Sequence, residues 1–207
     1  MKFTKAALAA TLLATVAMPA SAVTLSYGVT LTSDYISRGW TQTGNDAALQ
    51  PWVEAESNGF YGGLWASNVS LGPDDIEVDL YGGYRWSVNE TSFDLGYARY
   101  YYDSTGDAGG EIYFLVEQSI GEGTSLFGGM YIGHAGGVTL NDAHLGFSTT
   151  LYGSLTGSAR IGITPGNIMY ADMGLGYDVN DNVSLDARYY ARTGGAGRFV
   201  ASVGLSF

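Results

Sequence analysis

The chain contains no cysteine, and its only two lysines, Lys2 and Lys5, lie close to the N-terminus. Without cysteine the fold has neither a disulfide framework nor a thiolate metal site. The segment after residue 22 carries seven arginines and twenty acidic residues, a formal net charge of −13. Phosphate binding needs a basic face, so this acidic excess predicts no nucleic-acid partner.

Long apolar runs are also missing. No stretch of 18 apolar residues follows residue 22, whereas a membrane-spanning helix needs about 20. Residues 1–22 have the parts of a secretory signal: Lys2 and Lys5, an apolar run over residues 6–18, and the small-residue site Ala20-Ser21-Ala22. The run is too short to cross roughly 30 Å of hydrocarbon. We therefore expect a signal peptide over 1–22 and one domain over 23–207.

What the sequence does have is alternation with a period of two residues. Segment 197–207 is the clearest case, since Phe199, Ala201, Val203, Leu205 and Phe207 share one face and smaller or polar residues take the other. Segments of this kind, near the roughly 9–11 residues of a tilted membrane strand, cover 23–33, 47–57, 60–71, 75–86, 91–102, 110–120, 123–133, 141–152, 154–164, 169–179, 183–192 and 197–207. Two of them, 60–71 and 123–133, have apolar residues on both faces.

These segments predict an all-β fold: a single transmembrane, antiparallel, up-and-down β-barrel of about 12 strands, of the outer-membrane type. A soluble sandwich would also alternate, but long strands, apolar faces throughout and a terminal aromatic favour the barrel. Tight connections alternate with mostly longer ones at 34–46, 103–109, 134–140, 165–168 and 193–196. Outer-membrane barrels have short periplasmic turns and longer outer loops. We therefore expect both termini in the periplasm of a Gram-negative bacterium.

Aromatic residues gather near the expected strand ends, as in the two girdles of membrane barrels. One group comprises Tyr84, Trp86, Phe93, Tyr152, Tyr177 and Phe207, and the other comprises Tyr35, Tyr101, Tyr189 and Phe199. Ordinary strand propensity accounts for the enrichment but not for this clustering.

Charged residues fall mainly on the face opposite the apolar one. An arginine at mid-depth on the lipid face costs roughly 2–4 kcal/mol, so we expect these charges to line the lumen. The candidates are Glu54, Glu56, Glu77, Asp79, Arg85, Asp94, Glu117, Asp142, Arg160, Asp172, Asp186 and Arg188, with Glu111 and Arg192 on the same face. Arg99 breaks the pattern. It would reach the headgroups from the outer wall, or point inward if the strand has the opposite register.

Two further features invite interpretation. His144 shares a face with Asp142 and Ser148, but same-face neighbours on one strand align by default, and a hydrolase also needs oxyanion donors. We expect no enzyme activity and no catalytic, cofactor-binding or metal residues, and His134 is expected at a solvated loop edge. Segment 33–42 is either a loop anchored to the interface by Tyr35 and Trp40 or an infolded segment with Arg38 facing the acidic wall. The anchored loop is the simpler interpretation.

The same N-terminal region resembles a known family. The residues that carry the resemblance are Ser33-Asp34-Tyr35, Arg38-Gly39 and the run from Gly59 to Val69, which reads GFYGGLWASNV. They are similar to the TorF-type porins of proteobacteria, formerly described as a conserved family of unknown function. The resemblance extends over essentially all of 23–207. It implies an outer-membrane barrel with porin activity and brings no catalytic or ligand residues.

Together these observations predict a passive channel for small hydrophilic solutes, with a mild cation preference from its acidic lumen. A narrow conduit is favoured over a lumen filled by paired side chains. The alternative is a non-conducting barrel that acts as a structural anchor or surface-interaction protein. The expected partners are outer-membrane lipid and lipopolysaccharide, small solutes, and the barrel-assembly machinery during biogenesis. A homo-oligomer is compatible with the apolar outer wall, and no cofactor is expected.

Overall fold

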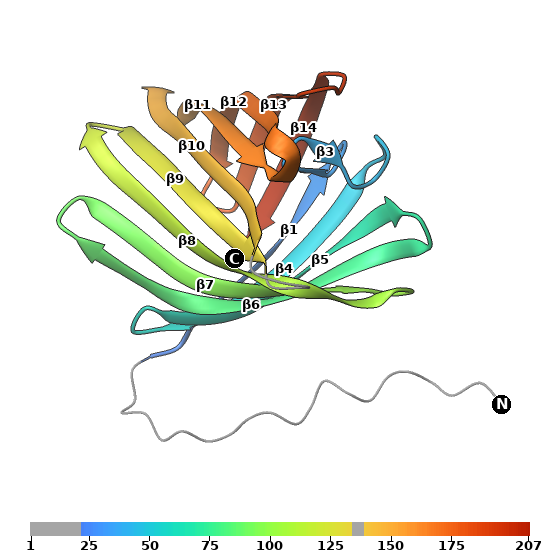
Figure 1. Ribbon diagram of the computed structural model, residues 1–207. Helices are drawn as coiled ribbons and strands as arrows, with labels where there is room; N and C mark the ends of the chain where they lie inside the picture. The colour runs from blue at the N-terminus through green and yellow to red at the C-terminus, as the bar shows by residue number, and fades with distance from the viewer. Residues whose placement is uncertain (1–21, 134–138) are drawn as a thin grey trace.

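The computed structural model describes residues 22–133 and 139–207 (Figure 1). Its main element is a closed antiparallel barrel in which each strand pairs with its neighbours in the chain and β1 pairs with β14. The twelve barrel strands are β1 (Thr24–Thr32), β4 (Ala48–Ser57), β5 (Phe60–Leu71), β6 (Asp74–Val88), β7 (Thr91–Tyr102), β8 (Gly106–Gly121), β9 (Thr124–Gly133), β10 (Thr139–Tyr152), β11 (Leu155–Thr164), β12 (Ile168–Asn180), β13 (Val183–Arg192) and β14 (Arg198–Ser206). The predicted twelve-stranded barrel is confirmed, with strand ends displaced by at most four residues.

Two shorter elements lie between barrel strands. A small hairpin, β2 (Ile36–Ser37) and β3 (Trp40–Thr41), connects β1 to β4, and a 3₁₀ turn, η1 (Pro165–Asn167), connects β11 to β12. Over 22–133 and 139–207 the chain forms no helix that is long and apolar enough to cross a membrane. The expected signal peptide lies outside the described residues except for Ala22, and His134 lies outside them too, so both stay predictions.

The outer wall of the barrel is apolar and its interior is polar. Leu145 is 60% exposed and Phe199 is 69% exposed, whereas Asp142 and Asp172 are buried in the lumen. This is the reverse of a water-soluble domain and matches a wall that faces lipid. The two ambiguous segments follow the same rule. In β5, for example, Phe60 points outward and Tyr61 is buried inside.

The barrel is closed by its first and last strands. In Figure 1 the blue β1 lies beside the red β14, and their register places Leu31 opposite Val203 and Gly28 opposite Ser206. Tyr27 and Phe207 complete this seam, since they exchange two backbone hydrogen bonds of 3.0 and 2.8 Å. Their rings also stack with centroids 5.7 Å apart. The terminal aromatic therefore belongs to the closing contact.

Glycines make room for aromatic rings inside the barrel. Gly96 in β7 lies directly opposite Tyr113 in β8, and a Cβ on Gly96 would overlap the tyrosine ring. The same arrangement of a glycine beneath a directly opposed inward ring recurs at Gly63 and Tyr81, Gly146 and Phe127, and Gly162 and Tyr170. Aromatic side chains that cover cross-strand glycines stabilise strongly curved sheets. This pairing explains part of the high glycine content.

Turn chemistry fixes the ends of several hairpins. Asn58 and Gly59 both have positive φ, 53° and 82°, which is typical of the two-residue turns that match strand twist. The expected long connection at 103–109 is wrong, because β8 begins at Gly106 and only 103–105 remain between β7 and β8. Asp103 ties this tight turn to β6, since its side chain accepts hydrogen bonds from the backbone N–H groups of Asp75 and Ile76.

Three members of one expected aromatic group form a continuous cluster on the outer wall. Tyr84 and Trp86 stack with centroids 5.8 Å apart, and Trp86 stacks on Phe93 at 5.2 Å. Phe114 extends the cluster across β8. The placement of Tyr35 in the other girdle is wrong, because its side chain lines a cavity inside the barrel.

Candidate functional site

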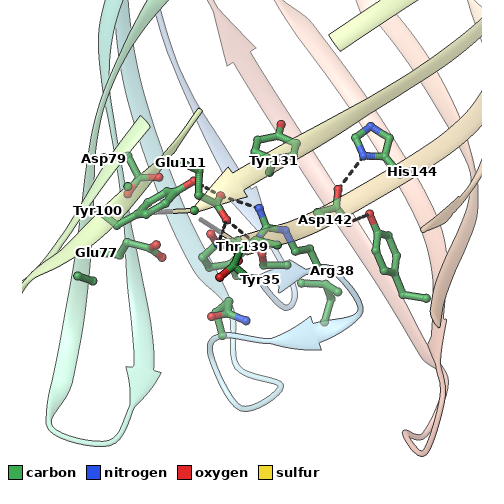
Figure 2. A pocket seen from close by; sticks show the side chains of 18 of the residues that line it. Tyr35, Arg38, Glu77, Asp79, Tyr100, Glu111, Tyr131, Thr139, Asp142 and His144 are labelled. Atoms are coloured by element: carbon green, nitrogen blue, oxygen red, sulfur yellow. Dashed lines mark hydrogen bonds and ion pairs between the residues drawn. The ribbon is translucent and has the colours of Figure 1, made fainter. Parts of the chain in front are cut away.

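The connection between β1 and β4 folds into the mouth of the barrel. Figure 2 shows the hairpin with Arg38 directed into the cavity. Arg38 and Gly39 both have positive φ, 49° and 79°, and a Cβ on Gly39 would lie 2.9 Å from Cβ of Tyr170 in β12. The hairpin tip is thus pressed against the wall formed by β12 and β13. The anchored-loop interpretation is wrong and its infolded alternative is the one observed.

Trp40 also departs from its expected role as an interface anchor. The guanidinium of Arg192 lies over its ring, 3.3 Å from the centroid. Stacking of this kind holds a cation and an aromatic ring together. Trp40 therefore ties the hairpin to β13, whereas Tyr35 contacts the ring of Trp65 in β5 at 5.3 Å between centroids.

An ion pair fixes the hairpin tip to the opposite wall. Arg38 donates two hydrogen bonds to Glu111 in β8, of 3.0 and 2.7 Å, and its guanidinium lies 5.0 Å from the ring centroid of Tyr131. Glu111 also accepts hydrogen bonds from Tyr100 and Asn141. Burial lowers the pKa of Arg38, but its hydrogen bonds to Glu111 outweigh this and leave the pKa above its ordinary value. The pair stays charged.

Asp34 organises the base of the hairpin. Its Oδ1 accepts hydrogen bonds from the hydroxyls of Thr41 and Thr43, at 2.5 and 2.9 Å, and Arg198 of β14 lies 3.5 Å from Oδ2. Asp34 and Thr43 are both buried. A carboxylate that receives several donors in this way fixes the conformation of a short loop.

The lumen contains two cavities along the barrel. One, of about 800 Å³, lies beneath the hairpin and is lined by Arg38, Tyr35 and Glu77 among others. The other, of about 740 Å³, lies toward the end that carries Glu56 and Arg85. Leu115, Phe127 and His144 line both cavities. These three side chains therefore mark the waist between them.

Arg85 is the centre of a charge cluster in the second cavity. It contacts Glu54 at 2.6 Å, Glu56 at 3.1 Å and Asp94 at 3.3 Å. Its guanidinium also lies 3.7 Å from the ring centroid of Tyr61. One cation therefore serves three carboxylates, which leaves this part of the lumen with a negative balance. Glu117 lines the same cavity.

A second charge ladder follows β11, β12 and β13. Asp172 lies between Arg160 and Arg188, with contacts of 2.8 and 2.7 Å. Arg188 also pairs with Asp186 at 3.1 Å. The structure thus brings together Arg160, Asp172, Asp186 and Arg188 from the expected lumen set. Such side-to-side pairing neutralises charge along this wall without crossing the lumen.

Glu77 and Asp79 have no such cation. Both lie on β6 and line the larger cavity (Figure 2). Glu77 is only 5% exposed; its Oε1 accepts a hydrogen bond of 3.0 Å from Tyr102, and the hydroxyl of Tyr35 also interacts with its carboxylate. Within the described residues, its Oε2 and the Oδ1 of Asp79 are buried and have no hydrogen-bond partner. These two oxygens are unsatisfied acceptors on the lumen wall.

His144 does not form a hydrolytic triad with Ser148. Its Nδ1 lies 2.8 Å from Asp142, which also accepts a hydrogen bond from Tyr170. Ser148 follows four residues later on β10, which is about 13 Å along an extended strand. That separation is beyond hydrogen-bond reach. Over 22–133 and 139–207 there is also no group of three or more histidine and acidic side chains arranged to hold a metal ion.

Arg99 lies on the outer wall, as the first of the two interpretations expected. It is opposite the outward-facing Leu80, and it pairs with Asp107 and with the hydroxyl of Tyr97. Asp107 was not anticipated as a partner because it lies in the segment expected to be a loop. The ion pair reduces the cost of an arginine on this face.

Sequence reasoning missed five tyrosines that line the larger cavity: Tyr35, Tyr100, Tyr102, Tyr131 and Tyr170. The places of Tyr100 and Tyr102 on the inward face could be read from the alternation of β7, where both share the parity of Asp94. The inward turn of Tyr35 depends on the hairpin fold and has no signal of that kind.

The apolar outer wall, closed strand order and charged lumen together define a transmembrane β-barrel with the fold of outer-membrane porins. The KdgM porin matches with a TM-score of 0.66 and 10% sequence identity, over 90% of this chain and 99% of that one. KdgM in complex with disordered oligogalacturonate matches with a TM-score of 0.66 and 11% sequence identity, over 90% of this chain and 99% of that one. The NanC porin matches with a TM-score of 0.57 and 10% sequence identity, over 89% of this chain and 99% of that one. At these identities the likeness shows the fold.

The chain belongs to a bacterial protein family of unknown function, Gcw_chp, whose profile matches residues 16–204. None of the curated proteins matches it. The family description agrees with the resemblance to a family of unknown function noted in the sequence. The TorF name is not part of that description and stays a prediction.

Proposed function

We propose that this protein is a passive outer-membrane channel for small hydrophilic solutes, with a mild preference for cations. Transport is diffusion through the lumen, filtered by its width and charge, and no chemical step or cofactor takes part. The observation that carries the proposal is the pair of buried, unpartnered carboxylate oxygens of Glu77 and Asp79 in a cavity of about 800 Å³. In their ionised form, carboxylates at such a place attract cations and repel anions.

The fold also supports the proposal of a channel. A barrel that shares its architecture with the KdgM and NanC porins has the framework for solute passage. The two lumen cavities meet at Leu115, Phe127 and His144, so a solute that crosses the barrel passes this waist. KdgM has been captured with oligogalacturonate, an acidic sugar polymer. An acidic solute suits this lumen poorly, because Glu77 and Asp79 repel carboxylates.

The wider set of inward charges would tune this preference. We propose this role for Glu54, Glu56, Glu77, Asp79, Arg85, Asp94, Glu117, Asp142, Arg160, Asp172, Asp186 and Arg188. Carboxylates outnumber arginines in this set, and the shared contacts of Arg85 leave a negative balance around the second cavity. We further propose that 1–22 is a signal peptide, that both termini lie in the periplasm, and that lipid, lipopolysaccharide and the barrel-assembly machinery are partners.

A non-conducting barrel is the second candidate, and one observation favours it. The hairpin is pinned across the mouth by Arg38 and Glu111, and ion pairs occupy part of the lumen below. In that case the protein would act as an anchor or present its loops to a partner.

Single-channel recording in planar bilayers separates these two candidates. Reproducible ohmic current steps from folded, heat-modifiable protein support the channel, and silence supports the anchor. In a salt gradient, the wild type should show a reversal potential of the sign expected for a cation-selective channel. Glu77→Gln combined with Asp79→Asn should move that potential toward anions, because the unpaired charges are removed. An unchanged value would refute the acidic filter.

A further inference from the structure

We propose that Glu77, Asp79, Tyr35, Tyr100 and Tyr102 form a binding site for a primary ammonium group carried by a small organic solute. We call these five residues the ammonium site. This inference names the solute class of the proposed channel and rests on that function.

The ammonium site is built by strand register. Glu77 in β6 lies directly opposite Tyr102 in β7, and Asp79 lies directly opposite Tyr100. The two carboxylates are two residues apart, so both point into the lumen from the same face. Tyr35 enters from the infolded connection after β1 and lines the same cavity. Figure 2 shows Glu77, Asp79 and Tyr100 on one side of the cavity, away from Asp142 and His144.

The chain's own arginines do not neutralise this site. Each of the seven contacts another group: Arg38 pairs with Glu111, Arg85 with Glu54, Arg99 with Asp107, Arg160 and Arg188 with Asp172, Arg198 with Asp34, and Arg192 stacks on Trp40. A buried carboxylate is costly unless it is paired and hydrogen-bonded. An external cation is therefore the group that would satisfy Glu77 and Asp79.

The free atoms at the site select the kind of cation. Oε2 of Glu77 and Oδ1 of Asp79 are acceptors without donors among the described residues, so the ligand must supply N–H groups. A primary ammonium has three such donors. A calcium ion needs six to eight oxygen ligands, and one oxygen of Glu77 already accepts the hydroxyl of Tyr102. The tyrosine rings add apolar and cation–π surface for an alkylammonium carbon chain.

Binding of butylammonium chloride to the purified, folded barrel in detergent tests this site. Isothermal titration calorimetry at constant ionic strength should give saturable binding by the wild type. Tetramethylammonium has the same charge but no N–H donor, and we expect it to bind at least fivefold more weakly. Glu77→Gln and Asp79→Asn should each weaken butylammonium binding at least tenfold, because each removes a charged acceptor.

Two variants complete the comparison. Glu122→Gln removes the same charge from the exposed turn between β8 and β9, and we expect its affinity to stay within twofold of the wild type. Tyr35→Leu leaves the strands unchanged, and its weaker binding would support the site even if a strand variant fails the heat-modifiability test for folding. Equal affinity for the two cations, or wild-type affinity in folded Glu77→Gln, overturns the site.

The binding measurement does not depend on conduction. If the barrel conducts but does not bind butylammonium, the ammonium site fails and the proposed channel stands. If it binds butylammonium and gives no current steps, the site stands and the channel fails.

Discussion

Arg38 and Glu111 are 73 residues apart in the chain and form a two-pronged ion pair across the mouth of the barrel. Glu111 is buried, with only 5% of its side chain exposed, whereas 28% of the Arg38 side chain is exposed. The pair joins a connecting hairpin to the wall that it faces. It therefore determines how much of the mouth the hairpin covers.

Replacement of Arg38 by alanine should release the hairpin tip. The guanidinium and its two hydrogen bonds to Glu111 would be lost, so the mouth should widen and the single-channel conductance should rise. We also expect a loss of about 1–3 kcal/mol in the free energy of unfolding, because Glu111 is left buried without its cation. Conductance in planar bilayers and urea unfolding in lipid vesicles measure the two effects. Arg99→Ala is the matched control, since its ion pair lies on the outer wall. A conductance rise equal to that of Arg38→Ala would contradict the proposed effect of the Arg38–Glu111 ion pair on the mouth.

Substitution of Gly96 by alanine should destabilise the barrel from inside. The added methyl group would overlap the ring of Tyr113, whose hydroxyl is 2.6 Å from that of Tyr61. Overpacking of this kind costs typically about 1–3 kcal/mol. Gly62→Ala is the control, because its Cβ would have only an ordinary contact of 3.7 Å with the Tyr81 carbonyl. Equal unfolding midpoints in urea for the two variants would show that the glycine makes no room for the ring.

Asp172→Asn should lower the free energy of unfolding, because it weakens the contacts between β11, β12 and β13. Asp172 is the shared acceptor of Arg160 and Arg188, and its loss leaves Arg160 without a carboxylate partner among the described residues and Arg188 with Asp186 alone. Charged hydrogen bonds of this type contribute about 1.5–3 kcal/mol. Urea titration of the folded fraction measures the loss, with the exposed turn variant Asp181→Asn as its charge-matched control. A stability equal to that control would mean that the ladder contributes nothing.

Arginine scanning of the outer wall should show a dependence on membrane depth. Leu145 lies near the middle of β10 and is 60% exposed, whereas Val88 is the last residue of β6 and is 55% exposed. Leu145→Arg should cost roughly 2–4 kcal/mol and Val88→Arg roughly 0–1 kcal/mol, because only the first charge meets mid-bilayer hydrocarbon. Unfolding in lipid vesicles gives both values. Equal costs at the two positions would mean that lipid does not surround this wall as described.

The strands were predictable because lipid and water impose opposite demands on alternate residues. In segment 197–207, Phe199 and Val203 are exposed and Val200 is buried, as the alternation requires. The alternation of apolar and polar residues does not identify the lipid-facing side of 60–71 and 123–133. The lumen also accommodates aromatic rings where a glycine on the neighbouring strand makes room for them. Tyr61 and Phe127 are such inward aromatic residues. Composition does not distinguish them from lipid-facing residues, but cross-strand register does.

The hairpin and the ammonium site were not predictable, for a different reason. Both depend on contacts between residues that are distant in the sequence. Arg38 faces the acidic wall only because Asp34 and its threonine partners turn the connection inward. Glu77 and Asp79 lack a cation only because every arginine has another partner, and that follows from the closed register. The Arg38-Gly39 pair with positive φ is a local sign of a tight tip, but it does not give the direction of folding.

The seam between β1 and β14 has a consequence for biogenesis. Polypeptides are synthesised from the N-terminus, so the partner of the first strand is among the last segments to be made. Until then the edge of β1 offers unpaired N–H and carbonyl groups, which promote aggregation. The backbone hydrogen bonds between Tyr27 and Phe207 therefore form only in a complete chain. A polypeptide that ends before Arg198 lacks β14 and keeps the edge of β1 open.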